Sequence, residues 1–198
     1  MAGSVRIGVL ALQGDFAAHV AALRGRGTSV VEIRHARELD ELSGIILPGG
    51  ESTTMLKLMN GTGLYERLGE TLRAGLPVLA TCAGVILLAR EVRNPEQRSL
   101  GVLDAVVQRN AYGRQIDSTV VPLTVEAAAG LPDRSIEGVF IRAPRLIDLG
   151  GGVEVLARRG ADPVLVRQGR ILAATFHPEL SGGSPVIELF LRLVGGAS

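Results

Sequence analysis

The chain has 198 residues, of which 46% are hydrophobic, and a formal net charge of +1. This length and apolar content suit one large domain with a substantial core, so we expect residues 1–198 to form a single domain. The balanced charge and the absence of an apolar run of roughly 18–20 residues give no reason to expect a nucleic-acid partner or a membrane. One cysteine cannot form an internal disulfide, which favours a cytoplasmic location.

The first half of the chain alternates predicted strands and helices. In order, we expect a strand over 5–10, a helix over 15–24, strands over 28–33 and 44–47, helices from Ser52 or Thr53 towards Met59 and over 64–73, a strand over 77–81 and a helix over 83–90. Asp15 is a suitable N-cap for the first helix, and Ser52 or Thr53 for the second. The short joints predict an α/β fold, with a mainly parallel, doubly wound sheet and helices on both faces.

The second half consists mostly of short alternating or apolar runs separated by Gly, Pro and Asp. These predict strands, several of them antiparallel, over 102–109, 118–125, 137–142, 153–157, 163–168 and 170–175. The segment 164–173 predicts a hairpin that turns about Gln168 and Gly169. A final helix is expected over 185–194, with one apolar face formed by Ile187, Phe190, Leu191 and Val194.

Cys82 lies where the predicted strand over 77–81 turns sharply into the next helix. A thiol at such a turn points outward at the carboxyl edge of the sheet, and the positive end of the helix dipole favours its nucleophilic thiolate form. The Gly49-Gly50 pair ends another strand at the same edge, where parallel sheets gather functional groups. Its backbone N–H and that of Ala83 are candidates for binding an oxyanion, although a Pro-Gly-Gly sequence alone only ends a strand.

His177 and Glu179 are separated by one proline. Side chains at i and i+2 of an extended segment point the same way, and Pro178 disfavours the helical conformation at His177. Glu179 can therefore orient one ring nitrogen while the other faces a thiol, as in a catalytic triad. An isolated cysteine is more often a core residue and an isolated histidine more often a surface one, but their joint occurrence at sheet ends favours catalysis.

The remaining polar candidates carry weaker signals. His19 and His35 have no cysteine or carboxylate at a ligand spacing, so we assign both to structural or surface roles and predict no metal site. Arg109 and Arg142 interrupt apolar strands, and the guanidinium group suits a substrate carboxylate. Each arginine equally fits a strand-edge charge without a ligand.

Six segments of the chain resemble motifs of a known family and occur in the same order. They are 12–14, 47–55, 81–84, 109–115, 139–144 and 176–180. The family comprises the glutaminase subunits of pyridoxal 5′-phosphate synthases, among the triad-type (class I) glutamine amidotransferases. The stretches Gly-Gly-Glu-Ser-Thr-Thr-Met and Phe-Ile-Arg-Ala-Pro are the most specific. Three features depart from the family pattern: Ala80 occupies a usual glycine of the turn around the cysteine, Ala18 precedes His19 where a glutamate is common, and the segment 180–184 carries less charge than expected.

The resemblance implies a role for each matching residue. Cys82 is the implied nucleophile, His177 the base and Glu179 its partner. The implied glutamine-binding residues are Gly50, Glu51, Ser52, Arg109, Ile141 and Arg142, and the implied oxyanion hole consists of the N–H groups of Gly50 and Ala83. The segment around Gln13 would lie near the mouth where a synthase subunit docks.

The implied activity is hydrolysis of the side-chain amide of L-glutamine through a glutamyl thioester, without a cofactor. The ammonia would pass to a lyase-like synthase partner that assembles the pyridine ring. Three alternatives stay open: a subunit that feeds another acceptor such as an imidazole-ring synthase, a binding module of the same fold without activity, and a free-standing thiol hydrolase or stress protein.

Overall fold

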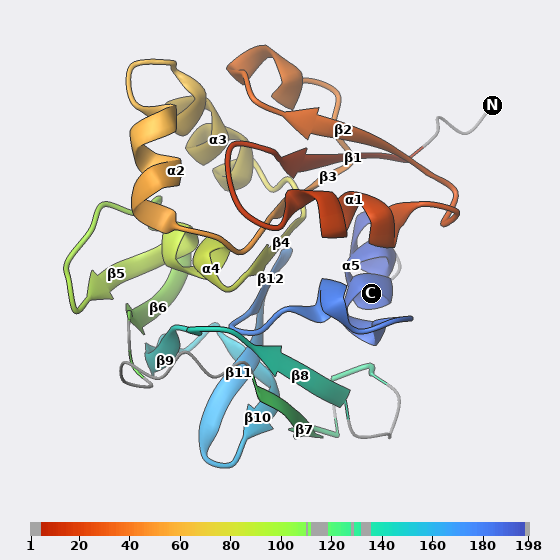
Figure 1. Ribbon diagram of the computed structural model, residues 1–198, viewed down its shortest axis with the longest axis vertical. Coiled ribbons are helices and arrows are strands. Elements are labelled where there is room, and N and C mark those ends of the chain that lie inside the picture. The colour runs from red at the N-terminus through yellow and green to blue at the C-terminus, as the bar shows by residue number, and fades with distance from the viewer. Residues whose placement is uncertain (1–4, 110, 112–118, 128, 132–135, 197–198) are drawn as a thin grey trace.

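The structure is a computed structural model that describes residues 5–109, 111, 119–127, 129–131 and 136–196. Its main sheet, as far as the described residues show, has the strand order β2-β1-β3-β4-β12-β11-β10-β7-β8 (Figure 1). These strands are β1 (Val5–Leu10), β2 (Thr28–Ile33), β3 (Gly44–Leu47), β4 (Val78–Thr81), β7 (Thr119–Val125), β8 (Ile136–Phe140), β10 (Glu154–Arg159), β11 (Asp162–Gln168) and β12 (Ile171–Ala174). The strands from β2 to β12 are parallel, and those from β12 to β8 pair antiparallel.

Helices cover both faces of this sheet (Figure 1). They are α1 (Phe16–Leu23), α2 (Ser52–Met59), α3 (Leu64–Arg73), α4 (Ala83–Leu88) and α5 (Pro185–Val194), with short 3₁₀ turns η1 (Ala36–Leu39) and η2 (Pro178–Leu180). One core cluster contains residues of α2, α3 and α4, and the other contains residues of α1 and α5. The predicted fold class, a mainly parallel α/β sheet with antiparallel strands in the second half, is confirmed. Within the described residues, no helix has the length and apolar character needed to cross a membrane.

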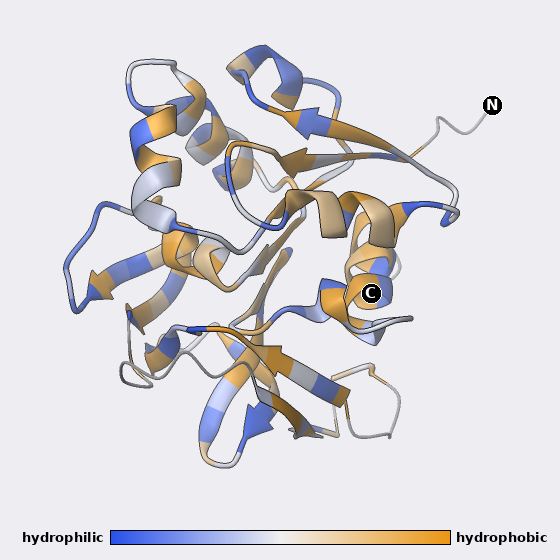
Figure 2. Ribbon diagram, in the orientation of Figure 1, coloured by the Kyte–Doolittle hydropathy of each residue, from blue (hydrophilic) through white to orange (hydrophobic). Residues whose placement is uncertain are grey.

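The central strands are buried on both sides. Along β3, Ile45 and Leu47 pack into the cluster with α2 to α4, whereas Ile46 packs into the cluster with α1 and α5. This alternation is the two-residue period of a strand, and it requires an apolar residue at every position. Figure 2 accordingly shows hydrophobic colouring along most of the central strands. Parallel order then brings the carboxyl ends of β1, β3 and β4 to one edge.

A smaller three-stranded sheet was only partly predicted. It has the order β5-β6-β9, with β5 (Ala89–Arg93), β6 (Leu103–Gln108) and β9 (Arg145–Leu149). The helix expected over 83–90 ends at Leu88, because the chain turns there into β5. Neither β5 nor β9 was expected, since both are short and carry several charged residues. The predicted hairpin is confirmed: β11 pairs with β12, and Gly169 takes a positive φ of 56° between them.

Candidate active site

Cys82 occupies a strained turn between β4 and α4. Its φ of 45° and ψ of −105° lie outside the regions that residues with a side chain normally adopt. The Cys82 N–H donates to the carbonyl of Ala174 in β12 at 2.9 Å, which ties the turn to the sheet. Gly84 is required for the turn, because a Cβ there would lie 2.1 Å from the carbonyl oxygen of Leu47. Ala80, which departs from the glycine of the resembled family pattern, is accommodated in the fully buried strand β4.

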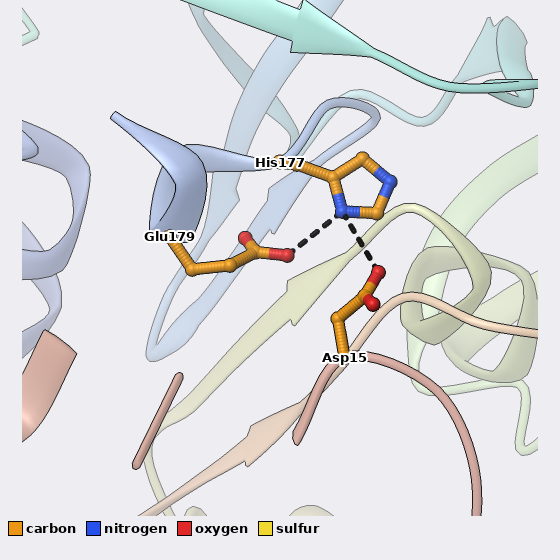
Figure 3. A group of neighbouring side chains, drawn as sticks. All are labelled: Asp15, His177 and Glu179. Carbon is orange, nitrogen blue, oxygen red and sulfur yellow. Dashed lines mark hydrogen bonds and ion pairs between the residues drawn. The ribbon is translucent and has the colours of Figure 1, made fainter. Parts of the chain in front are cut away.

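His177 and Glu179 form a buried pair. The Nδ1 atom of His177 lies 2.7 Å from Oε1 of Glu179 (Figure 3), and the two side chains are 3% and 0% exposed. The backbone is not extended as predicted, since Pro178 begins the turn η2 directly after His177. The carboxylate can only accept, so Nδ1 carries the hydrogen and leaves Nε2 for the thiol. A Cβ at Gly49 would lie 2.5 Å from Cε1 of His177 and 3.3 Å from Cβ of Cys82, so the imidazole and the cysteine converge over this glycine.

The electrostatics of the pair favour an ionised site. Burial disfavours the charged form of His177, but its interactions with Cys82 and Glu179 outweigh burial and raise the pKa of His177 from 6.5 to about 10. Burial also opposes the charge of Glu179, yet its hydrogen bond with His177 and the proximity of His19 lower its pKa to about 2. An imidazolium that is held by a carboxylate beside a cysteine is the arrangement that activates a cysteine nucleophile.

A cleft next to this pair contains every residue predicted for glutamine and oxyanion binding. The predicted residues that line it are Gly50, Glu51, Ser52, Ala83, Arg109, Ile141 and Arg142, together with Cys82 and His177. Asp15, Ile86 and Pro144 also line the cleft, and none of these three was predicted as a site residue. Residues 110 and 112–115 of the motif at 109–115 lie outside the described residues.

The polar walls of the cleft are already hydrogen-bonded to one another. A terminal nitrogen of Arg109 lies 3.2 Å from a carboxylate oxygen of Glu51 and 3.3 Å from the hydroxyl of Thr53. Glu51, and neither Ser52 nor Thr53, is the N-cap of α2, because its carboxylate accepts from the Thr53 N–H. The Ser52 hydroxyl instead donates to the side-chain oxygen of Gln97. Cys82 and Ile141 face each other, with Sγ 3.8 Å from the Ile141 carbonyl.

The glycine loop after β3 is held by the segment that precedes α1. The side-chain oxygen of Gln13 accepts from the Glu51 N–H at 2.6 Å, and the Asp15 N–H donates to the Gly49 carbonyl at 3.1 Å. A Cβ at Gly14 would lie 1.9 Å from that carbonyl oxygen, so the two segments touch backbone to backbone. Gly50 has a φ of 146°, a conformation that favours glycine.

Asp15 is the N-cap of α1 as predicted and His19 is a buried residue of that helix, but both also lie close to the His177–Glu179 pair, which the sequence did not indicate. The Asp15 side chain makes no capping hydrogen bond, and its carboxylate instead lies 3.5 Å from Nδ1 of His177 (Figure 3). His19 is fully buried, with Nε2 3.1 Å from the Thr81 hydroxyl and 3.3 Å from Oε2 of Glu179. The spacing of Asp15 and His19, four residues apart on one helical face, is the signal that links them.

One group of metal-ligating side chains also lies here. The ligand atoms of Asp15, His177 and Glu179 lie within 4.8 Å of one another. A metal at this position would have to displace the hydrogen that His177 donates to Glu179, so the geometry fits an acid–base pair better. His35, in contrast, is exposed at the start of η1, in agreement with the predicted surface role.

Comparison with known proteins identifies relatives over nearly the whole length. The model of the SNO glutamine amidotransferase family matches residues 9–195. A pyridoxal 5′-phosphate synthase subunit PdxT of Koribacter versatilis is 53% identical over 190 residues, which cover 96% of each chain. The subunit of the same name from Thermotoga neapolitana is 48% identical and is covered completely. A crystal structure of a glutamine amidotransferase is 50% identical in sequence to this chain and superposes on it with a TM-score of 0.87. The match covers 96% of this chain and 98% of that one.

Proposed function

Because the chain belongs to the SNO glutamine amidotransferase family, we propose that it is the glutaminase subunit of a pyridoxal 5′-phosphate synthase, with Cys82, His177 and Glu179 as its catalytic triad. The observation that carries the triad assignment is the convergence of the strained Cys82 and the His177 imidazole over Gly49, with Oε1 of Glu179 2.7 Å from Nδ1 of His177. The family match from residue 9 to residue 195 supports one glutaminase domain over 1–198.

The reaction follows from the proton positions in this triad. The Cys82 thiolate attacks the side-chain amide carbon of glutamine, and the His177 imidazolium protonates the departing nitrogen, which leaves as ammonia. The product is a γ-glutamyl thioester on Cys82 and a neutral His177. His177 then takes a proton from water as the water attacks the thioester, and the thiolate leaves with release of glutamate. Glu179 keeps Nδ1 protonated throughout and stabilises each imidazolium.

Each tetrahedral intermediate carries an oxyanion that needs donors. We assign the N–H groups of Gly50 and Ala83 to this role, and both residues line the cleft beside Cys82. Ala83 is the first residue of α4, so its N–H has no partner within the helix and points from the positive end of the helix dipole. Gly50 has a positive φ, which favours glycine, and a Cβ at this position would also lie 2.5 Å from the Gln13 side-chain oxygen. Both features require a residue without a Cβ.

Specificity for glutamine requires recognition of its α-amino and α-carboxylate groups, because the amide alone is common to many molecules. Arg109 and Arg142 line the cleft and suit the carboxylate, and Glu51 suits the ammonium. The Arg109–Glu51 contact at 3.2 Å supports this assignment, since it holds opposite charges ready for the two ends of an amino acid. Gly50, Ser52 and Ile141 complete the wall.

The ammonia acceptor is assigned from the relatives, whose name describes a subunit of a pyridoxal 5′-phosphate synthase. The synthase subunit would dock over the segment around Gln13, which contacts the glycine loop at the cleft, and receive ammonia along a protected route. A cytoplasmic location suits this chemistry, because Cys82 is a free thiol and must stay reduced.

The test is glutamate release with and without purified synthase subunits. We expect the chain to hydrolyse glutamine faster with a pyridoxal 5′-phosphate synthase subunit than with an imidazole-ring synthase subunit. Cys82→Ala should abolish hydrolysis at unchanged thermal stability, and a glutamine analogue that alkylates thiols should label the native chain at Cys82 alone. Normal turnover by Cys82→Ala would refute the nucleophile assignment, and stimulation by the imidazole-ring synthase alone would refute the acceptor.

A further inference from the structure

The buried carboxylate of Glu179 has two oxygens, and the triad accounts for only one of them. Oε1 accepts from His177, whereas Oε2 is fully buried and makes no well-aligned hydrogen bond with any described residue. A buried carboxylate oxygen without a donor is costly, so a nearby N–H is expected to serve it. Nε2 of His19 lies 3.3 Å from Oε2, and the His19 side chain has no exposed surface.

The N–H of His19 lies between two acceptors. Nε2 is 3.1 Å from the Thr81 hydroxyl and 3.3 Å from Oε2, and it must carry the hydrogen because an ionised carboxylate has none to donate. The bond to Thr81 is the better aligned of the two. Hydrogen bonds of catalytic groups are often poorly aligned before substrate binds and straighten during the reaction.

The fold alone does not explain a histidine at this position. Nδ1 of His19 is buried and has no hydrogen-bond partner among the described residues, which lowers stability relative to an apolar side chain of similar size. The neighbours on the same face, Phe16 and Leu23, are apolar and pack without such a cost. The position of Nε2 against the catalytic carboxylate is the feature that an apolar residue would not supply.

We propose that His19 is a positioning residue of the glutaminase reaction, which donates to Oε2 of Glu179 and so keeps Oε1 on His177 through both proton transfers. The inference rests on the proposed function of the same triad. When His177 gives its proton to the departing amide nitrogen, Glu179 loses the neighbouring positive charge, and the His19 N–H then becomes the donor that keeps the buried carboxylate ionised and in place.

This role predicts a change in the pH dependence of turnover. The ionisable groups around Glu179 are His177 and His19, with Asp15 on the other side of Nδ1 and Cys82 beyond the imidazole. Helix α5 and strand β8 also pack against η2, and their charged residues, Glu188, Arg192 and Glu137, are exposed. His19 is among the causes of the lowered pKa of Glu179, so loss of its donor should move the acidic limb of the rate profile to higher pH.

The decisive comparison is His19→Met against His19→Gln, measured as glutamine hydrolysis in the complex with the synthase subunit. Methionine has a similar length without a donor, whereas the glutamine side chain places an N–H close to the position of Nε2. We expect His19→Met to lower kcat by roughly 10- to 100-fold, as loss of a hydrogen bond to a charged group does, with KM changed less than about twofold. The kcat of His19→Gln should stay within about threefold of the native value, and the acidic limb of its pH–rate profile should lie at the native pH.

A second variant tests the proposal where His19→Met does not fold. Thr81→Val has nearly the shape of threonine and removes the competing acceptor, so the His19 N–H is left to Glu179. We expect the kcat of Thr81→Val to lie within about twofold of the native value, and the acidic limb of its pH–rate profile to lie at the same or a lower pH. Equal loss in His19→Met and His19→Gln, native kinetics in His19→Met, or a tenfold loss in Thr81→Val would each overturn the proposal. Native turnover is the reference in all cases, so an inactive native complex would refute the proposed function instead.

Discussion

The substitution Gly49→Ala tests the geometry of the site without changing any triad residue. A Cβ at Gly49 would lie 2.5 Å from Cε1 of His177, 3.2 Å from its Nδ1 and 3.3 Å from Cβ of Cys82. The φ of Gly49 lies outside the positive range that favours glycine, so the added methyl acts through space rather than through backbone strain. The imidazole is buried and bonded to Glu179, so it has little freedom to move away.

The size of the effect follows from the displacement. Ordinary contact begins at 3.4 Å, so Cε1 of His177 must retreat by 0.9 Å, which is 3.4 minus 2.5. A misplacement of about 1 Å at a reacting centre costs on the order of 10²-fold in rate, or about 2.7 kcal/mol of transition-state stabilisation. Overpacking of a tight site also lowers the free energy of unfolding by about 1–3 kcal/mol. We therefore expect kcat to fall about 100-fold while the protein remains folded.

The assay is steady-state glutamate release in the presence of the synthase subunit, together with urea unfolding and the rate of Cys82 alkylation. Gly151→Ala is the matched control, because a Cβ there meets no atom within 4 Å and its φ also lies outside the positive range. The control should keep native kcat and stability. Native kcat in Gly49→Ala would refute the reasoning, since it would mean that His177 does not need its position over the glycine loop.

Three further predictions concern charges around the imidazole. Asp15→Asn should change kcat by less than about threefold, because the Asp15 side chain is 48% exposed and its charge, 3.5 Å from Nδ1 of His177, is screened by solvent. The lowered pKa of Glu179 contributes up to about 3 kcal/mol to the free energy of unfolding above pH 4.5, and this contribution is lost as the pH falls towards 2. Glu179→Gln should remove it, so the free energies of unfolding of variant and native protein, measured with urea, should converge near pH 2. Arg109→Lys should raise KM for glutamine about tenfold with kcat little changed, because a lysine cannot reproduce the planar contact with a carboxylate, and equal KM values would contradict the binding role.

The sequence predicted the parallel half of the fold almost to the residue, for a physical reason. A strand covered on both faces, such as 44–47, is a continuous apolar run between turn residues, and the helix over 64–73 has an apolar face of regular period. The strand β5 has no such pattern, because only Ala89 and Val92 are buried and the intervening residues are charged and exposed. Its place is set by pairing with β6, a contact that local periodicity does not encode.

The candidate site divides along the same line. Cys82, His177 and Glu179 could be proposed as a triad from the sequence because each is chemically unusual at its place in the chain, and a parallel sheet brings strand ends together. His19 gave no such signal, since its partners Thr81 and Glu179 are 62 and 160 positions away and meet it only after α1 packs against η2. Asp15 was interpreted as a helix cap because the cap is a local requirement, whereas its approach to His177 depends on how the segment before α1 crosses the glycine loop. Local chemistry therefore predicts the proposed triad, whereas the proposed positioning role of His19 becomes apparent only from the packing of helix α1 against that triad.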